Sequence, residues 1–193
     1  MEDVLVDIHT VNPRIILDIR YATDHNIAGT KLYPAAKAYL RKSVAVKLSH
    51  VQSALEKKGM SLKVWDAYRP LSVQYQLWNL MPDERYVANP FTGSDHNKGC
   101  AVDVTLTDAW GNDLEMPTGF DDFSSQAHLS STNHAEHVIA NRDLLVKSMI
   151  EHDFQSFATE WWHYTVPNAS DYSLETISFD ELENLSVLSS NHI

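Results

Sequence analysis

The pattern of apolar and polar residues along the chain predicts two long amphipathic helices. The first is expected from about Ala36 to Lys58, ending before Gly59, and the second from about Asn133 to His152. In both segments apolar residues recur every three or four positions, the spacing that puts them on one face of a helix. These positions are Val44, Leu48, Val51 and Leu55 in the first segment, and Val138, Leu144, Leu145, Met149 and Ile150 in the second. Both helices should therefore pack against a core.

Shorter apolar runs predict strands around these helices. The first thirty residues alternate runs such as "VLVDI" and "RIILDIRYAT" with the turn signals "NP" and "AGT". The run "LKVWDAYRP" predicts a strand ending at Pro70, and Ser72 is expected to cap a helix through "VQYQLWNLM" to Pro82. After a loop around Gly93 to Gly99, "CAVDVTL" predicts a strand closed by the turn "WGND". "TEWWHYTV" predicts a last strand from its aromatic and β-branched content.

This order of elements predicts an α+β fold. Strands and helices follow one another with unequal connections, without the regular alternation of a doubly wound sheet. A chain of 193 residues is long enough for one domain with a substantial core and too short for two of ordinary size. We predict a single domain over residues 1–167. Residues 168–193 are polar and are expected to form a C-terminal tail that is loosely packed or partly helical.

Composition and charge narrow the classes of function. The chain has 26 acidic and 15 basic residues and a formal net charge of -11, whereas nucleic acids and anionic membranes bind basic surfaces. We therefore expect a small-molecule substrate and neither of those partners; the oligomeric state stays open, a homo-oligomer included. The N-terminus lacks the features of a secretory signal, no run is long enough to span a bilayer, and the single Cys100 excludes an intramolecular disulfide. These features predict a cytoplasmic protein, unless a signal segment was removed.

Candidate chemistry is concentrated in two short segments. The stretch "SDHNKGCAVDV" holds His96 and Asp103, and "EWWH" holds Glu160 and His163. A zinc hydrolase needs three protein ligands, for which imidazole and carboxylate groups are suitable, and a further carboxylate that takes a proton from water. His96, Asp103 and His163 fit the first requirement, and Glu160 fits the second. On a regular strand Glu160 and His163 would point to opposite faces, so a bulge or a strand end is required. His96 and Asp103 raise the same difficulty, and there Gly99 marks a natural break.

Other arrangements of these residue types stay open. His134 and His137 in "HAEH" form a rival pair on one helical face, but they lack a base at metalloprotease spacing. The "SDH" sequence at Ser94 contains the residue types of a serine triad without the G-x-S-x-G elbow. Cys100 is a candidate nucleophile or fourth ligand, although a free cysteine is more often a small buried residue. Spacing alone does not prove that the proposed zinc ligands converge.

Longer motifs around these residues resemble a known family. The stretch "SDHNKGCAVDVTL" is similar to the S-x-H-x-x-G-x-A-x-D-x-T-L motif of zinc-dependent D-alanyl-D-alanine dipeptidases of the vancomycin-resistance (VanX) type. "EWWHY" is similar to the second zinc and base motif of that family. The segments "IRYATDHNIAG", "WDAYRP" and "MPTGFDDFS" match further motifs in the same order. The resemblance covers roughly Val4 to Pro167, and the ordered series of motifs makes it specific.

The resemblance implies a fold, a reaction and a set of catalytic residues. The fold would be an antiparallel sheet flanked by helices, shared with zinc D,D-carboxypeptidases and the Hedgehog signalling domain. One zinc ion per chain would be held by His96, Asp103 and His163. Glu160 would be the catalytic acid and base, and Arg69 would stabilise the transition state. The implied reaction is hydrolysis of D-alanyl-D-alanine, a peptidoglycan building block, to two D-alanine molecules.

The same resemblance puts three more residues in the substrate pocket. These are Tyr21, Ser94 and Asp121, of which Asp121 would face the ammonium group of the dipeptide. Two departures from the family pattern are expected to border that pocket and so to bear on substrate preference. The segment between Trp78 and Ser94 is shorter, and Pro117 stands where a glycine is usual.

Two alternatives to a dipeptidase remain at this point. A D,D-carboxypeptidase or another cell-wall peptidase would use the same zinc site and would tolerate a substrate whose amino group is acylated. A non-catalytic, zinc-stabilised binding domain would also be compatible with the shared fold. Glu160 and Arg69 argue against the binding domain, because a structural zinc site is normally closed by four ligands and needs neither residue.

Overall fold

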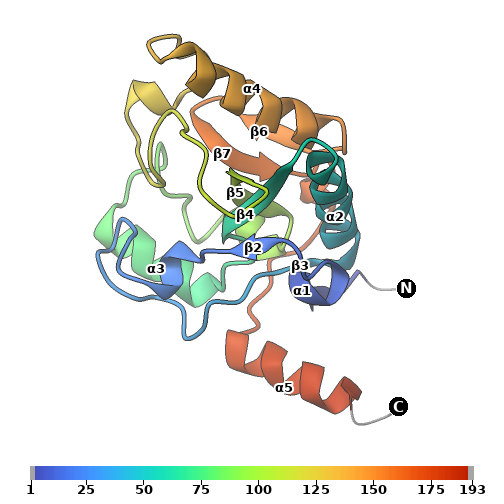
Figure 1. The fold of residues 1–193 in the computed structure, drawn as a ribbon. Coiled ribbons are helices and arrows are strands. Elements are labelled where there is room, and N and C mark those ends of the chain that lie inside the picture. Colours follow the sequence, from blue (N-terminus) through green and yellow to red (C-terminus); the bar gives the residue numbers. More distant parts are fainter. Residues whose placement is uncertain (1–2, 191–193) are drawn as a thin grey trace.

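A five-stranded sheet forms the centre of the protein in this computed structural model, which describes residues 3–190 (Figure 1). The strand order is β2-β4-β5-β7-β6, and every pair is antiparallel except β2 with β4, which is parallel. The strands are β2 (Ile16–Leu17), β4 (Met60–Asp66), β5 (Ala101–Asp108), β7 (Glu160–Thr165) and β6 (Gln155–Phe157). A separate antiparallel pair joins β1 (Leu5–Asp7) to β3 (Tyr39–Arg41). The predicted α+β class is confirmed, with one parallel pair at the sheet edge that the sequence did not predict.

The two long helices cover one face of the five-stranded sheet, and loops lie on the other face. The helices are α1 (Ile8–Val11), α2 (Lys42–Glu56), α3 (Leu71–Leu80), α4 (Glu136–Ile150) and α5 (Phe179–Ser190). The two long helices, α2 and α4, pack together against one face (Figure 1). Leu62 pairs with Leu106 and Val64 with Val104, so these apolar residues share one face of β4 and β5. The alternate residue Asp103 then faces the other side, where the loops lie.

The sequence predicted both long helices but not their boundaries. The first was expected from Ala36, yet α2 begins at Lys42 because Tyr39–Arg41 pairs with β1 as a strand. The second begins at Glu136, and Ile150 at its end is 53% exposed instead of buried, because it lies in the last turn. The other apolar positions predicted for these two helices are buried or partly buried.

The region after β4 differs more from the prediction. The strand ends at Asp66 and not at Pro70, and Ser72 does not cap the helix that follows. Pro70 occupies the cap position of α3, where the backbone N–H that proline lacks is not needed within the helix. The residues between Asp66 and Pro70 lie outside the five-stranded sheet and connect β4 to α3.

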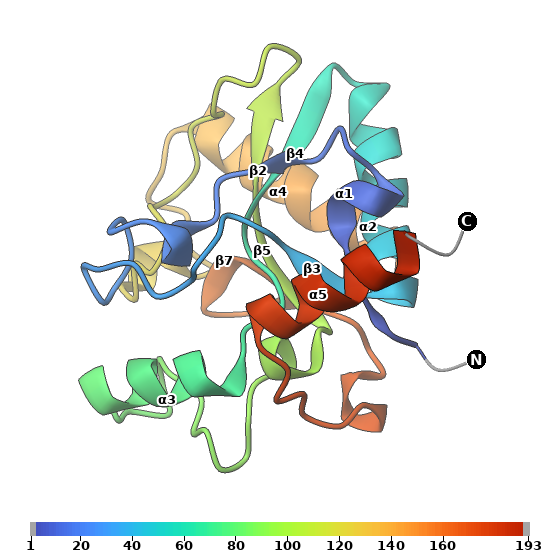
Figure 2. The ribbon, with the colours of Figure 1, turned by 90° about the horizontal axis from the view of Figure 1, so that it is seen from below.

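The C-terminal part of the chain contributes to the core. Its polar composition predicted a loosely packed or partly helical tail, and α5 is helical. Phe179 and Leu182 of α5 are buried, and the Phe179 ring lies 4.7 Å from that of Tyr33 and 5.5 Å from that of Tyr39, between ring centroids. Figure 2 shows α5 lying across β3. The domain boundary at residue 167 stays a prediction.

None of the helices within residues 3–190 combines the length and the apolar character that crossing a membrane requires.

We expect Gln52→Ala to lower the free energy of unfolding by about 1–3 kcal/mol, the usual cost of leaving a buried donor unpaired. The two-residue strand β2 does not reach Leu62, whose N–H donates instead to Gln52 Oε1 at 2.8 Å. Gln52 is fully buried on α2. Urea denaturation followed by circular dichroism measures the loss. Gln155→Ala, at an exposed position of β6, is the matched control, and an equal loss in both variants would contradict the prediction.

Candidate active site

Three polar residues lie in a row across the centre of the sheet. On β4, β5 and β7, Asp66 is paired with Asp103, and Asp103 with His163. Residues directly opposite each other on neighbouring strands point to the same face. The pairing of the strands therefore brings two carboxylates and an imidazole together on the face that the long helices do not cover.

His96 joins this row from a loop. It lies in a 3-10 helix, η2 (Asp95–Lys98), which ends at Gly99 in the left-handed conformation with φ of 71°. The Nδ1 atom of His96 lies 2.6 Å from the carbonyl oxygen of Ala67, so Nδ1 carries the hydrogen and Nε2 is free to bind. Because His96 is not on a strand, the parity difficulty with Asp103 does not arise.

Glu160 and His163 reach the same pocket because the pairing of β6 with β7 is irregular. Ser156 of β6 pairs with Tyr164, but the next residue of β6 pairs with Glu160. The extra residues on β7 interrupt the alternation of side chains, as in a bulge. Trp162 and His163 consequently both line the pocket although they are adjacent in the chain. The sequence required a bulge or a strand end here, and Glu160 is the first residue of β7, next to this irregularity.

The donor atoms of His96, Asp103 and His163 fit a zinc ion. The distance is 3.2 Å from His96 Nε2 to His163 Nδ1, 2.9 Å from His163 Nδ1 to Asp103 Oδ1, and 3.4 Å from His96 Nε2 to Asp103 Oδ1. Ligands about 2.0–2.1 Å from a tetrahedral zinc are about 3.3 Å from each other, so the three atoms nearly form one face of such a tetrahedron. Within residues 3–190 this is the one group of three or more donors close enough to share a metal ion.

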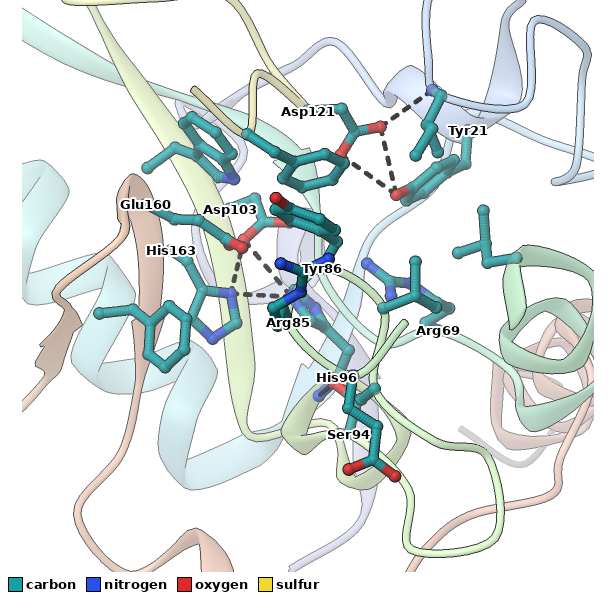
Figure 3. A pocket seen from close by; sticks show the side chains of 18 residues that line it. Tyr21, Arg69, Arg85, Tyr86, Ser94, His96, Asp103, Asp121, Glu160 and His163 are labelled. Carbon is teal, nitrogen blue, oxygen red and sulfur yellow. Dashed lines mark hydrogen bonds and ion pairs between the residues drawn. The ribbon is translucent and has the colours of Figure 1, made fainter. Parts of the chain in front are cut away.

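Every residue that the sequence suggested for the site lines one cavity of about 170 Å³. Figure 3 shows these side chains converging from β5, β7, η2 and the surrounding loops. They are Tyr21, Arg69, Ser94, His96, Asp103, Asp121, Glu160 and His163. Ser94 also accepts a hydrogen bond at 3.2 Å from the backbone N–H of His96, and so stabilises the turn that presents His96.

Burial changes the acidity of two carboxyl groups in the cavity. Loss of hydration on burial raises the pKa of Glu160 to about 7. Burial likewise raises the pKa of Asp121 to about 6, although the N–H of Ile27 donates to its Oδ2 at 3.0 Å. A carboxyl group that gains and loses a proton near neutral pH suits acid and base chemistry, so Glu160 has the acidity that the predicted role requires.

Arg69 is held rigidly by residues that the sequence analysis did not identify. Its Nε and Nη2 donate to Asp66 Oδ2 at 3.0 and 2.7 Å, and its Nη1 donates to Gln74 Oε1 at 3.0 Å. The guanidinium also lies 5.0 Å from the centre of the Tyr21 ring. The motif "WDAYRP" contains Asp66 and could have pointed to it, whereas nothing in the sequence distinguished Gln74 from other polar helix residues.

Two loops complete the wall of the cavity, one in the segment before Ser94 and one that contains Asp121. Tyr86, from the short segment before Ser94, packs against Phe123 with ring centroids 4.9 Å apart. Both rings line the cavity, as do Glu84 and Arg85, of which Arg85 forms an ion pair with Asp83. The segment that departs in length from the family pattern therefore borders the pocket, as expected.

The rival groups do not form a site. His134 Nε2 lies 3.0 Å from the carbonyl oxygen of Gln126, and His137 pairs with Glu115 on the surface. Cys100 is buried, which raises the pKa of its thiol to about 12, so the thiol stays protonated. Neither histidine nor the cysteine belongs to the cluster of metal donors found within residues 3–190.

Comparison with known proteins identifies the family of the chain. The sequence profile of the peptidase M15 family, described as D-ala-D-ala dipeptidase, matches residues 1–181. The chain is 35% identical to a D-alanyl-D-alanine dipeptidase of Escherichia coli over 170 residues, 88% of each chain. It is 29% identical to one of Enterococcus faecalis over 168 residues, 76% of this chain and 83% of the relative.

A solved structure to which the chain is similar is the vancomycin-resistance D,D-dipeptidase VanXYg in complex with a D-Ala-D-Ala phosphinate analog. The TM-score is 0.46 and the identity 15%, over 94% of this chain and 75% of the other. The family profile and the relative from E. coli each span most of the sequence. This chain therefore belongs to the D-alanyl-D-alanine dipeptidase family of peptidases, as its motifs predicted.

Proposed function

We propose that the chain is a zinc dipeptidase that hydrolyses D-alanyl-D-alanine to two D-alanine molecules, with one zinc ion held by His96, Asp103 and His163. The observation that carries the proposal is the geometry of these three donors, which lie 2.9–3.4 Å apart on the wall of a small cavity. Three protein ligands leave the fourth position open, which is typical of catalytic and not of structural zinc sites. A non-catalytic binding domain is therefore the weaker reading.

The side chains around the three ligands supply the other parts of a hydrolysis reaction. Zinc, when bound, would polarise the scissile carbonyl and make a water molecule more acidic. Glu160 takes the proton of the attacking water and returns it to the leaving amine, a double role that suits a pKa of about 7. The positive charge of Arg69, oriented by Asp66 and Gln74, offsets the negative charge that develops on the carbonyl oxygen.

The cavity suits a small substrate with a free amino group. Asp121 is largely buried, and within the described residues no lysine or arginine forms an ion pair with it. A buried carboxylate without a cation is unfavourable, so an ammonium group of the substrate would complete the site. Tyr86 and Phe123, which are in contact and both line the cavity, leave it a volume of only about 170 Å³ together with the other lining residues. These features favour a free dipeptide over the longer substrates of a D,D-carboxypeptidase.

We expect Glu160→Gln to lower kcat for D-Ala-D-Ala by about 10²–10⁴-fold, the usual contribution of a positioned acid and base. The amide keeps the size of the side chain but cannot accept the proton. Release of D-alanine measures the rate, and metal analysis of the purified variant should give the zinc content of the unaltered protein. A variant that binds zinc and keeps full turnover would contradict the role given to Glu160.

We expect Asp121→Asn to raise KM for free D-Ala-D-Ala by about 10-fold or more, because a charged contact contributes about 1.5–3 kcal/mol. N-acetyl-D-Ala-D-Ala has no ammonium group, so its slower hydrolysis should be little affected by the same substitution. Steady-state kinetics on both substrates, with Asp122→Asn as a control at the neighbouring position, measures the difference. If the unaltered protein cleaves the acetylated substrate as fast as the free dipeptide, the carboxypeptidase reading is correct instead.

A further inference from the structure

The segment that connects η4 (Ala169–Asp171) to α5 packs against the turn that carries His96. In Figure 2 this orange-red part of the chain passes beside the green turn of η2. The backbone N–H of Glu175 donates to the carbonyl oxygen of Asn97 at 2.9 Å. Leu174 lies so close to Gly93 that a side chain on that glycine would collide with it. The segment therefore contacts the chain on both sides of His96.

A partly buried ion pair connects this segment to the end of η2. Arg41, whose side chain is only 8% exposed, forms an ion pair with Glu175 at 2.5 Å from Nη2 to Oε1. Its Nε donates to the carbonyl oxygen of Lys98 at 2.9 Å, and its backbone N–H donates to that of Gly99 at 3.0 Å. The guanidinium also lies 5.3 Å from the centre of the Tyr172 ring. One arginine thus joins the C-terminal segment to the last turn of η2.

Together these contacts satisfy the free carbonyl groups at the end of η2. The last carbonyl groups of a helix have no partner within the helix and need one from elsewhere. Here the carbonyl oxygen of Asn97 accepts a hydrogen bond from Glu175, and the carbonyl oxygens of Lys98 and Gly99 accept hydrogen bonds from Arg41. Short 3-10 helices have poor hydrogen-bond geometry of their own, so external contacts decide whether such a turn keeps its shape.

The same segment also supports the residues around Arg69. Tyr68, which precedes Arg69, donates from its hydroxyl group to the carbonyl oxygen of Ile177 at 2.7 Å. Phe179 packs on Tyr33, whose hydroxyl group donates to Asp66 Oδ1 at 2.6 Å. Residues 172–179 therefore contact both the turn that carries His96 and the residues next to the ion pair of Arg69 with Asp66.

We propose that residues 172–179, named here the C-terminal strap, position the metal site, and that Arg41 and Glu175 are positioning residues for His96. The proposal rests on the proposed function for the identity of the metal as zinc. The strap follows the motifs that the sequence singled out, which end near Pro167, and lies within residues 1–181, which the family profile matches. Partners hydrogen-bonded to a metal ligand contribute about 10–100-fold to metal affinity. Arg41 and Glu175 contact the backbone of the turn and not the imidazole, so loss of their ion pair should weaken zinc binding by an amount at the lower end of that range.

Zinc affinity of the full-length protein tests the strap directly. Competition with a chromophoric chelator should give a dissociation constant about 10-fold higher for Glu175→Ala, and a smaller increase for Glu175→Gln, which keeps hydrogen-bonding atoms at the same place. Glu151→Ala is the matched control, because Glu151 pairs with Lys147 on the exposed end of α4. The control should bind zinc like the unaltered protein.

Kinetics and stability separate positioning from a general loss of structure. At saturating zinc, Glu175→Ala should recover kcat, with KM for D-Ala-D-Ala unchanged, because the substrate contacts are intact. Unchanged zinc affinity in both Glu175 variants would overturn the proposal, and so would a fall in thermal stability without a fall in affinity. The chelator measurement does not depend on hydrolysis, so failure of the dipeptidase proposal would appear separately, as zinc binding without release of D-alanine.

Discussion

Two buried aspartates face each other at the centre of the sheet, and the active site is arranged around them. Asp66 and Asp103 are paired residues on β4 and β5, exposed by 0% and 3%. Like charges at such a place repel each other strongly unless each carboxylate has its own positive or hydrogen-bonding partner. Arg69 bonds to Asp66, while His96 and His163 lie against Asp103. Arg69 therefore lies at Asp66 and the two imidazoles lie at Asp103. The three side chains are close together because the two aspartates are neighbours, and each stays at its own carboxylate.

Much of the fold could be predicted because it depends on residues close together in the chain. Leu48, Val51 and Leu55 predicted α2 from their spacing, and all three are buried. The start of α2 could not be predicted in this way. Tyr39–Arg41 looks helical by local pattern, and only its pairing with Leu5–Asp7 makes it a strand. Tertiary pairing of this kind overrides local propensity and leaves no signal in a single sequence.

For the site, too, the sequence predicted the types of residue but not the contacts that bring them together. The motifs identified His96, Asp103 and His163 as residue types suited to zinc, and the resemblance supplied their roles. Their convergence depends on the pairing of Asp103 with His163 and on the η2 turn that presents His96, neither of which is visible in the spacing. Gln74 was missed because it contacts Arg69 and not a substrate or a metal. Sequence motifs report chemistry well and supporting contacts poorly.

The contacts that hold the turn of His96 come from parts of the chain that are far apart in the sequence. Arg41 and Glu175 are separated by 134 positions, yet both hold the end of η2. The turn that carries His96 has four residues, too few to be stable without external partners. Its shape is therefore imposed when β3 and the C-terminal strap have docked on it. The metal site is then a property of the complete fold and not of the motif that contains two of its ligands.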